Sequence, residues 1–263
     1  MERQWVRYHL EQSVARVTLN RPRVLNSFHR GMAHQLQSVL AEIQKEERAR
    51  SILLTGEGRA FCAGQDLAEA VGGEGSPQAD IAAIVRDSYN PIIQAIRTTE
   101  KPFLCAVNGV AAGAGANIAL ACDIVLASRE ASFLQAFSKI GLIPDSGGTF
   151  FLPRLVGLSR ATAMMMLAEP ISADEACEMG LIYRVCEPEK LLPEALELAQ
   201  ELAHRPTRAL GLIKRALNQS LVNDLPAQLA VEEQLQAMAA RTRDFREGVA
   251  AFLAKRKPDF QGR

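Results

Sequence analysis

The sequence predicts an α/β fold whose sheet-forming part comes first and whose C-terminal part is helical. In the first half of the chain, short apolar runs typical of strands alternate with glycine-rich turns and amphipathic helices, which is the pattern of α/β folds. Towards the C-terminus the apolar residues recur at helical spacing instead. We therefore expect a core over residues 1–200 and a helical C-terminal subdomain over residues 201–263.

Individual elements follow from the same patterns. Apolar runs between turn-forming residues predict strands at 5–10, 14–19, 51–55, 103–107 and 123–127. Apolar residues three and four apart predict helices over 29–46, 81–96 with a kink at Pro91, 188–203, 206–217, 226–241 and 243–255. The segment Ser172–Glu175 has the pattern of a capping box. Residues 71–79 are expected to form a mobile loop, and residues 108–115 a glycine- and alanine-rich turn before an apolar segment at 118–121.

Charge and cysteine content exclude several classes of function. The 30 Lys and Arg residues balance 30 Asp and Glu residues, so the chain lacks the positive charge of a nucleic-acid or membrane-surface protein. Its 5 cysteines are odd in number and form no CxxC pair, which argues against a disulfide framework or a zinc site and favours free thiols. The N-terminus has no apolar signal segment, and the apolar stretch 102–127 is interrupted by glycines and polar residues, so we expect a cytoplasmic protein.

Three glycine-rich turns are the places where chemistry could occur. They lie at 63–66, 108–115 and 141–149, each beside a short apolar run. Glycine allows a backbone to approach a ligand closely and to present its N–H groups, so two such turns could form an oxyanion hole. Each turn taken singly is more simply explained as a tight connection between a strand and a helix. A dinucleotide site is disfavoured, because Ile118 stands where the third glycine of that motif belongs.

Several ordered motifs resemble the crotonase, or enoyl-CoA hydratase/isomerase, superfamily. The resemblance spans nearly the whole chain, and its ordered motifs are far more specific together than singly. They are NRP at 20–22, RAFCAGQDL at 59–67, AVNG at 106–109, CDIV at 122–125, GLIP at 141–144, GGT at 147–149, ADEA at 173–176, GL at 180–181 and AAFLAKRKP at 250–258.

The resemblance implies a fold, an assembly and a ligand class. The expected fold is a crotonase-like spiral of ββα units with a helical C-terminal region that builds a homotrimer or a dimer of trimers. The expected ligands are acyl-CoA thioesters, with CoA as part of the substrate and with no metal or redox cofactor.

The shared chemistry of the family is stabilisation of an enolate at the thioester oxygen. Two preorganised backbone N–H donors act where the negative charge develops, and losing one such donor typically costs about 10²–10³ in rate. By motif position, these donors would be the N–H groups of Gln65 and Ala114. Ala114 stands where the family often has glycine, and a backbone donor tolerates that change where the local φ is allowed.

The acid and base residues decide which reaction follows. The two glutamates of the family's hydratases map onto Asn117 and Phe137, neither of which transfers protons as a carboxylate does. Asp145 remains, directly after Pro144, where some isomerases of the family place an aspartate. Taken alone, Asp145 is explained as a turn or N-cap residue satisfied by the N–H groups of Gly147 or Gly148. The resemblance favours a proton-transfer role, because one carboxylate suffices for a double-bond shift.

The stretch 141–149 (GLIPDSGGT), FREGV at 245–249 and AFLAKR at 251–256 resemble most closely the isomerases of phenylacetate degradation. Those enzymes convert ring-1,2-epoxyphenylacetyl-CoA into its oxepin isomer, and are also associated with double-bond shifts in unsaturated acyl-CoA. Two alternatives stay open within the family: a 3-enoyl/2-enoyl-CoA isomerase and a weak enoyl-CoA hydratase. A non-catalytic CoA-binding oligomeric protein is a third alternative, from another class.

The resemblance also implies where CoA binds. The residues at the matching motif positions are Arg23, Val24 and Leu25 near the nucleotide, and Ala63, Gln65, Asp66 and Leu67 along the adenine and pantetheine. Phe252 and Lys255 match residues that reach the CoA of a neighbouring subunit. The alternative for the basic stretch 255–257 is a solvated end of a helix. Tyr89 and Gln135 are candidates for shaping the acyl pocket.

Overall fold

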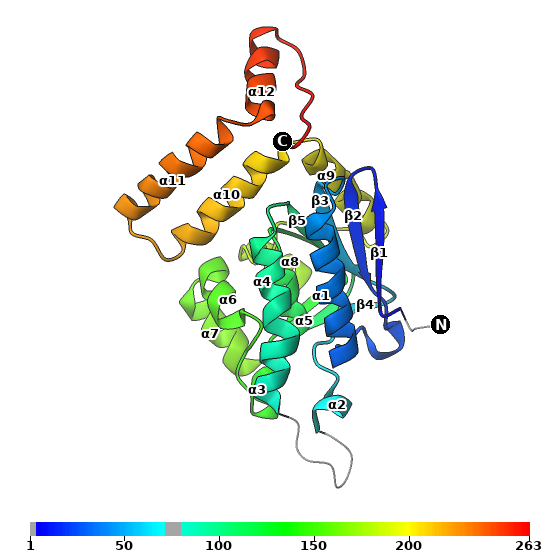
Figure 1. Ribbon diagram of the computed structural model, residues 1–263. Helices are drawn as coiled ribbons and strands as arrows, with labels where there is room; N and C mark the ends of the chain where they lie inside the picture. The colour runs from blue at the N-terminus through cyan, green and yellow to red at the C-terminus, as the bar shows by residue number, and fades with distance from the viewer. Residues whose placement is uncertain (1–3, 72–79) are drawn as a thin grey trace.

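A mainly parallel sheet runs through the body of the molecule (Figure 1). The computed structural model describes residues 4–71 and 80–263; residues 72–79 of the expected loop at 71–79 lie outside them. Within the described residues this sheet has six strands, in the order β1-β2-β3-β5-β7-β10, and β1 is the antiparallel one. Their bounds are β1 Val6–Glu11, β2 Val14–Leu19, β3 Ser51–Gly56, β5 Phe103–Val107, β7 Ile124–Ser128 and β10 Arg184–Cys186.

A second, smaller sheet is built from short strands that follow the long ones in the chain. It contains β4 (Ala60–Cys62), β6 (Val110–Ala112), β8 (Ser132–Leu134) and β9 (Ile171–Ser172), in that order. Thus β3, β5 and β7 are each followed directly by β4, β6 and β8, and each pair is then followed by helical residues. This repetition confirms the expected spiral of ββα units.

Helices cover both faces of the large sheet because its strands are apolar on both sides. Successive side chains of a strand point to opposite faces, so Ile52 and Leu54 of β3 join one core cluster and Leu53 the other. Helix α1 (Arg30–Lys45) packs on the first face, and α9 (Leu191–Ala203) lies on the second.

The helix expected over 81–96 is one helical run from α3 (Ile81–Ile84) through a π-helical turn (Val85–Tyr89) to α4 (Asn90–Thr98). The N–H of Asn90 donates to the carbonyl of Val85, five residues back. Because proline lacks an N–H and its ring clashes with the preceding turn of an α-helix, the wider turn accommodates Pro91. It also places Tyr89, which is buried, against Phe28.

Two expectations need correction. The segment 108–115 is more than a turn, because strand β6 occupies its middle and α5 (Ala114–Leu120) begins at its end. Strand β10 was also not expected in the largely helical second half of the core, where it pairs in parallel with β7, and neither were β4, β8 and β9 of the small sheet. These unexpected strands are two or three residues long, too short to show a periodic pattern. The remaining elements of the core are the 3-10 turns Pro22–Val24 and Ala136–Ile140 and the helices α2 (Leu67–Val71), α6 (Gly148–Val156), α7 (Leu158–Leu167) and α8 (Ala173–Glu178), whose capping box is formed as predicted.

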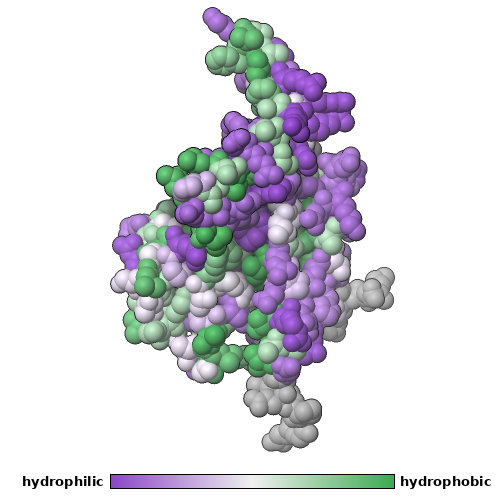
Figure 2. Space-filling view, turned by 60° about the vertical axis from the view of Figure 1, so that its left-hand side comes forward, coloured by the Kyte–Doolittle hydropathy of each residue, from purple (hydrophilic) through white to green (hydrophobic). Residues whose placement is uncertain are grey.

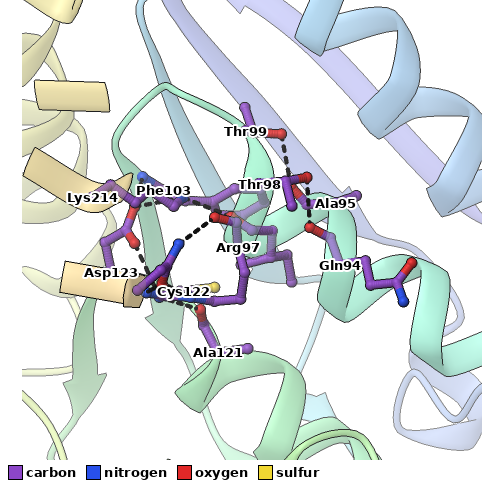
Figure 3. A network of polar contacts seen from close by, with 12 residues as sticks. Gln94, Ala95, Arg97, Thr98, Thr99, Phe103, Ala121, Cys122, Asp123 and Lys214 are labelled. Atoms are coloured by element: carbon purple, nitrogen blue, oxygen red, sulfur yellow. Dashed lines mark hydrogen bonds and ion pairs between the residues drawn. The ribbon is translucent and has the colours of Figure 1, made fainter. Parts of the chain in front are cut away.

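Three helices project from the body as an arm: α10 (Thr207–Ser220), α11 (Leu225–Ala239) and α12 (Arg243–Leu253) (Figure 1). A buried cation anchors the first of them. The Lys214 ammonium donates to the carbonyl of Ile96 and pairs with Asp123 at 2.9 Å, while Arg97 pairs with the other oxygen of Asp123 (Figure 3). Burial lowers the pKa of Lys214, and the negative charge of Asp123 opposes that change.

The arm carries much of the exposed apolar surface (Figure 2). Its exposed hydrophobic side chains include Ile213, Leu217, Leu229, Phe245, Val249, Phe252 and Leu253. Across residues 4–71 and 80–263, none of the helices combines the length and the apolar character needed to cross a bilayer. The five cysteines are free thiols, as expected, and four of them are buried.

Candidate active site

The first glycine turn follows β4 and leaves one backbone donor without a partner. The carbonyl of Gly64 accepts from the N–H of Phe28, and the N–H of Asp66 donates to the carbonyl of Phe28, both at 2.7 Å. In such a parallel bridge the amide of the residue between, Gln65, faces away from the partner strand. Within the described residues this amide has no hydrogen-bond acceptor.

The second donor lies at the start of α5. The positive φ of the turn, +54°, falls on Gly113, so Ala114 sits in the first helical turn, where an alanine is unstrained. An alanine at position 114, where the family often has glycine, therefore fits this backbone. The first N–H groups of a helix have no partner within the helix, and that of Ala114 finds no acceptor elsewhere in the described part of the chain.

The two turns meet at Gly64. A Cβ atom on Gly64, whose φ is +90°, would lie 2.9 Å from the carbonyl oxygen of Ala112 and 3.6 Å from the nitrogen of Ala114. Only a residue without a side chain allows this approach, and it brings the amides of Gln65 and Ala114 to neighbouring positions. Two neighbouring N–H groups without partners in the described residues can bind an oxygen with developing negative charge where they point to a common position.

Asp145 lies half-buried in the third glycine turn, before α6. Its carboxylate accepts from the hydroxyl of Ser146 at 2.8 Å, and burial raises the pKa of Asp145 against the lowering effect of that hydrogen bond. The N–H of Gly148 donates to the main-chain carbonyl of Asp145, and α6 has no side-chain cap. The alternative that Asp145 serves as an N-cap is therefore wrong, and its carboxylate is left for other chemistry.

The two positions at which the resemblance predicts the hydratase glutamates hold neutral side chains. Asn117 is fully buried in α5, and its amide nitrogen donates to the main-chain carbonyl of Asp145 at 2.8 Å. Phe137 is also buried, with its ring 3.7 Å from the position of a Cβ on Gly113. Neither group can activate water as a carboxylate does.

Tyr89, at the end of the π-helical turn, links that helix to the glycine turn at 63–66, which carries the Gln65 amide. Its hydroxyl donates to the side-chain oxygen of Gln65 at 2.6 Å. Burial raises the pKa of Tyr89, and neighbouring acidic groups, Asp145 among them, add to the rise. A second carboxylate, Glu69, accepts from the Gln65 side chain at 3.3 Å, but it also accepts from the amide of Arg30 at the start of α1. Sequence reasoning did not find Glu69.

The residues expected around CoA come from two segments that lie together. The N–H of Ala63 donates to the carbonyl of Leu25, which has a φ of +53°, and the Asp66 carboxylate pairs with Arg21 at 3.0 Å. Arg23, Val24 and Leu67 are exposed on the same two segments. The structure therefore brings these residues to one surface strip beside the donor turn, and adds Arg21, which its charge and its place in the NRP string could have suggested.

Phe252 and Lys255 are not brought to this strip within one chain. Phe252 lies in α12 and Lys255 just beyond it, at the far end of the arm, whereas α5 lies in the body (Figure 1). Both side chains are exposed, with 82% of Phe252 accessible to solvent. Contact between these residues and CoA would require a second copy of the chain.

Comparison with known proteins agrees with this architecture. The model of the family described as enoyl-CoA hydratase/isomerase matches residues 9–263. The chain is 48% identical to the 1,2-epoxyphenylacetyl-CoA isomerase of Escherichia coli over 97% of each chain, and 46% identical to a probable enoyl-CoA hydratase of Rhodobacter capsulatus over 98% of each. A crystal structure of a putative enoyl-CoA hydratase/isomerase from Mycobacterium abscessus superposes with a TM-score of 0.92 at 37% identity, covering 98% of this chain and 100% of that one.

Proposed function

Because the chain belongs to the enoyl-CoA hydratase/isomerase family, we propose that it is an acyl-CoA isomerase that acts on ring-1,2-epoxyphenylacetyl-CoA and shifts double bonds in unsaturated acyl-CoA. The observation that carries this proposal is the replacement of both hydratase glutamates by Asn117 and Phe137, next to a half-buried Asp145 with a raised pKa. The named activity of the E. coli relative supports the choice of substrate.

In the proposed mechanism, the thioester oxygen sits between the amides of Gln65 and Ala114. The ionised carboxylate of Asp145 removes a proton from the carbon next to the thioester, and the electron pair moves onto the thioester oxygen as an enolate. The same carboxyl returns the proton to a carbon further along the conjugated system. With the epoxide substrate, the carbon–carbon bond between the two epoxide carbons also breaks as the double bonds rearrange, and its electron pair becomes part of the new double bonds of the seven-membered oxepin. The product is an isomer of the substrate, and no water is consumed.

The central test compares two carboxylates near the donor turn. Asp145→Asn should lower kcat for isomerisation by about 10²–10⁴, the usual contribution of a general acid–base group, while a saturated acyl-CoA still binds. Glu69→Gln is the matched variant and should lose far less activity, because Glu69 serves the start of α1. Unchanged turnover in Asp145→Asn, or a larger loss in Glu69→Gln, would assign the base elsewhere.

A panel of three substrates separates the alternative functions: the aromatic epoxide-CoA, a 3-enoyl-CoA and crotonyl-CoA. Gain of the 2-enoyl chromophore marks isomerisation, and its loss marks hydration. Binding without any change marks a non-catalytic protein. We expect turnover of the first two substrates and a much lower rate, or none, with crotonyl-CoA.

We also propose that the protein is a homotrimer or a dimer of trimers in which the arm covers a neighbouring subunit. The exposed apolar side chains of α10, α11 and α12 support this, because a single chain leaves them in water. Sedimentation equilibrium distinguishes the two assemblies from a monomer.

A further inference from the structure

Asn117 connects the helix that carries one oxyanion donor to the turn that carries the carboxylate. Ala114 and Asn117 are three residues apart in α5, all of whose residues are buried. The Asn117 amide nitrogen donates to the main-chain carbonyl of Asp145, and the Asn117 oxygen accepts from the side-chain nitrogen of Gln135, also at 2.8 Å. One side chain therefore joins α5, the residue after β8 and the Asp145 turn.

The orientation of both amides follows from the carbonyl of Asp145. A main-chain carbonyl only accepts, so the nitrogen of Asn117 must face it, and the oxygen of Asn117 must face Gln135. Gln135 then has to present its nitrogen. This leaves its side-chain oxygen buried and, within the described residues, without a hydrogen-bond partner. An unsatisfied buried oxygen is destabilising, so this orientation of Gln135 lowers stability.

The Asp145 turn packs closely on Asn117. A Cβ on Gly148 would lie 2.5 Å from the Asn117 side-chain nitrogen, so no side chain fits between this turn and α5. The N–H of Gly148 shares the Asp145 carbonyl with Asn117. The main chain of Asp145 is thus held at one atom by two donors, one of which belongs to α5.

We propose that Asn117, oriented by Gln135, is a positioning residue that sets the place of the Asp145 carboxylate relative to the Ala114 amide. This inference rests on the proposed function. Proton transfer needs the carboxylate at the acyl carbon while the oxygen is held, and a displacement of about 1 Å can cost roughly 10² in rate. An ionised glutamate at position 117 could not donate this hydrogen bond. An amide at position 117 therefore lacks the proton-transfer ability of the hydratase glutamate, but it supplies a hydrogen-bond donor that an ionised glutamate could not.

The discriminating variant is Asn117→Asp, which keeps the size of the side chain. The introduced carboxyl group, when protonated, can donate to the Asp145 carbonyl and accept from Gln135, whereas in its ionised form it can only accept. We expect wild-type kcat to rise with pH to a plateau as Asp145 ionises. The variant should give a bell-shaped profile, with kcat at least about 10-fold below wild type on the alkaline side and KM changed less than about 3-fold.

Two further variants complete the test. Asn117→Ala should lower kcat by about 10–100-fold without a new alkaline limb, because it has no titrating group. Asn218→Ala is the matched control, since its amide nitrogen also donates to a main-chain carbonyl, that of Arg97, and its oxygen accepts from a side chain, that of Arg97, at the base of the arm; it should keep the wild-type profile. A plateau in Asn117→Asp that matches wild type would overturn the proposal.

If circular dichroism shows that Asn117→Asp does not fold, Gln135→Met decides instead. It removes the donor that orients Asn117, and we expect kcat to fall by about 3–10-fold with KM unchanged; equal kcat would overturn the proposal. Failure of the proposed function is distinguishable from failure of this inference. If the proposed function is wrong, wild type and Asp145→Asn will convert the three substrates of the panel at equal rates.

Discussion

Helices α5 and α11 differ in how much of each is buried within the chain. Every residue of α5 is buried within the chain; Ala114, its first residue, lies against the glycine turn at 63–66, and Asn117 contacts the Asp145 turn. In α11, Leu235 is the buried residue, and Leu225 and Leu229 are exposed. The geometry of the site is thus fixed by packing inside one subunit. The arm depends on its anchor and, we propose, on contact with other subunits.

The largest expected effect comes from breaking the anchor of the arm. Lys214→Met leaves Asp123 paired with Arg97 alone and removes the hydrogen bond to Ile96. Removing one partner of a buried ion pair typically costs about 3–5 kcal/mol, and we expect the lower end because Arg97 remains. Chemical denaturation measures the loss, and limited proteolysis near residue 205 should cut the arm before the body.

The control for this variant is Arg205→Met, which removes an exposed ion pair with Glu201. Such pairs are worth less than about 1 kcal/mol. If both variants lost the same free energy of unfolding, the buried network of Lys214, Asp123 and Arg97 would hold the arm no better than an exposed ion pair does. The body and the arm would then differ only in the area that each buries.

A smaller effect on stability is expected in the body, from the buried carboxyl group of Asp145. Burial raises the pKa of Asp145 in the folded state, so the folded protein holds this proton more tightly than the unfolded chain does. Stability therefore falls as pH rises from the ordinary aspartate pKa through the raised one, and the cost remains at neutral pH. Asp145→Asn removes it while its side-chain oxygen still accepts from Ser146.

We expect the thermal midpoint of Asp145→Asn to exceed that of wild type at neutral pH and to equal it in acid, where Asp145 is protonated in both states. Differential scanning calorimetry across this pH range checks the sign. A lower midpoint for Asp145→Asn at neutral pH would mean that the surroundings of Asp145 stabilise its ionised carboxylate instead of destabilising it.

Much of the fold was predictable because its signals are local. The long strands β2, β3 and β5 and the helices α1, α9 and α12 follow from apolar periodicity, and the capping box of α8 from two residues. The short strands β4, β6, β8, β9 and β10 were missed, because their pairing partners lie elsewhere in the chain. The division of the chain at residue 200 stays a prediction.

The site was predictable only as a set of segments. Its glycines and Asp145 stand in motifs, so the sequence placed them in the right turns. The link between Asn117 and Gln135 was not visible, because it depends on how the fold brings the residue after β8 against α5. Sequence reasoning treated Asn117 as a missing acid, and the structure shows what its amide holds. A polar residue in an otherwise apolar helix was the available signal.

The smallest expected effect tests whether the arm of one subunit completes the site of another. Lys255 is exposed beyond α12, with a φ of +50°. If it meets a CoA phosphate across a subunit interface, Lys255→Ala should raise the dissociation constant of a saturated acyl-CoA about 2–5-fold, the scale of a solvent-exposed charge contact, and weaken its dependence on salt. Lys257→Ala is the control, because it removes a neighbouring charge of the same basic stretch. Equal effects in the two variants, or none in either, would favour a solvated helix end, and the body would then bind the ligand without the arm.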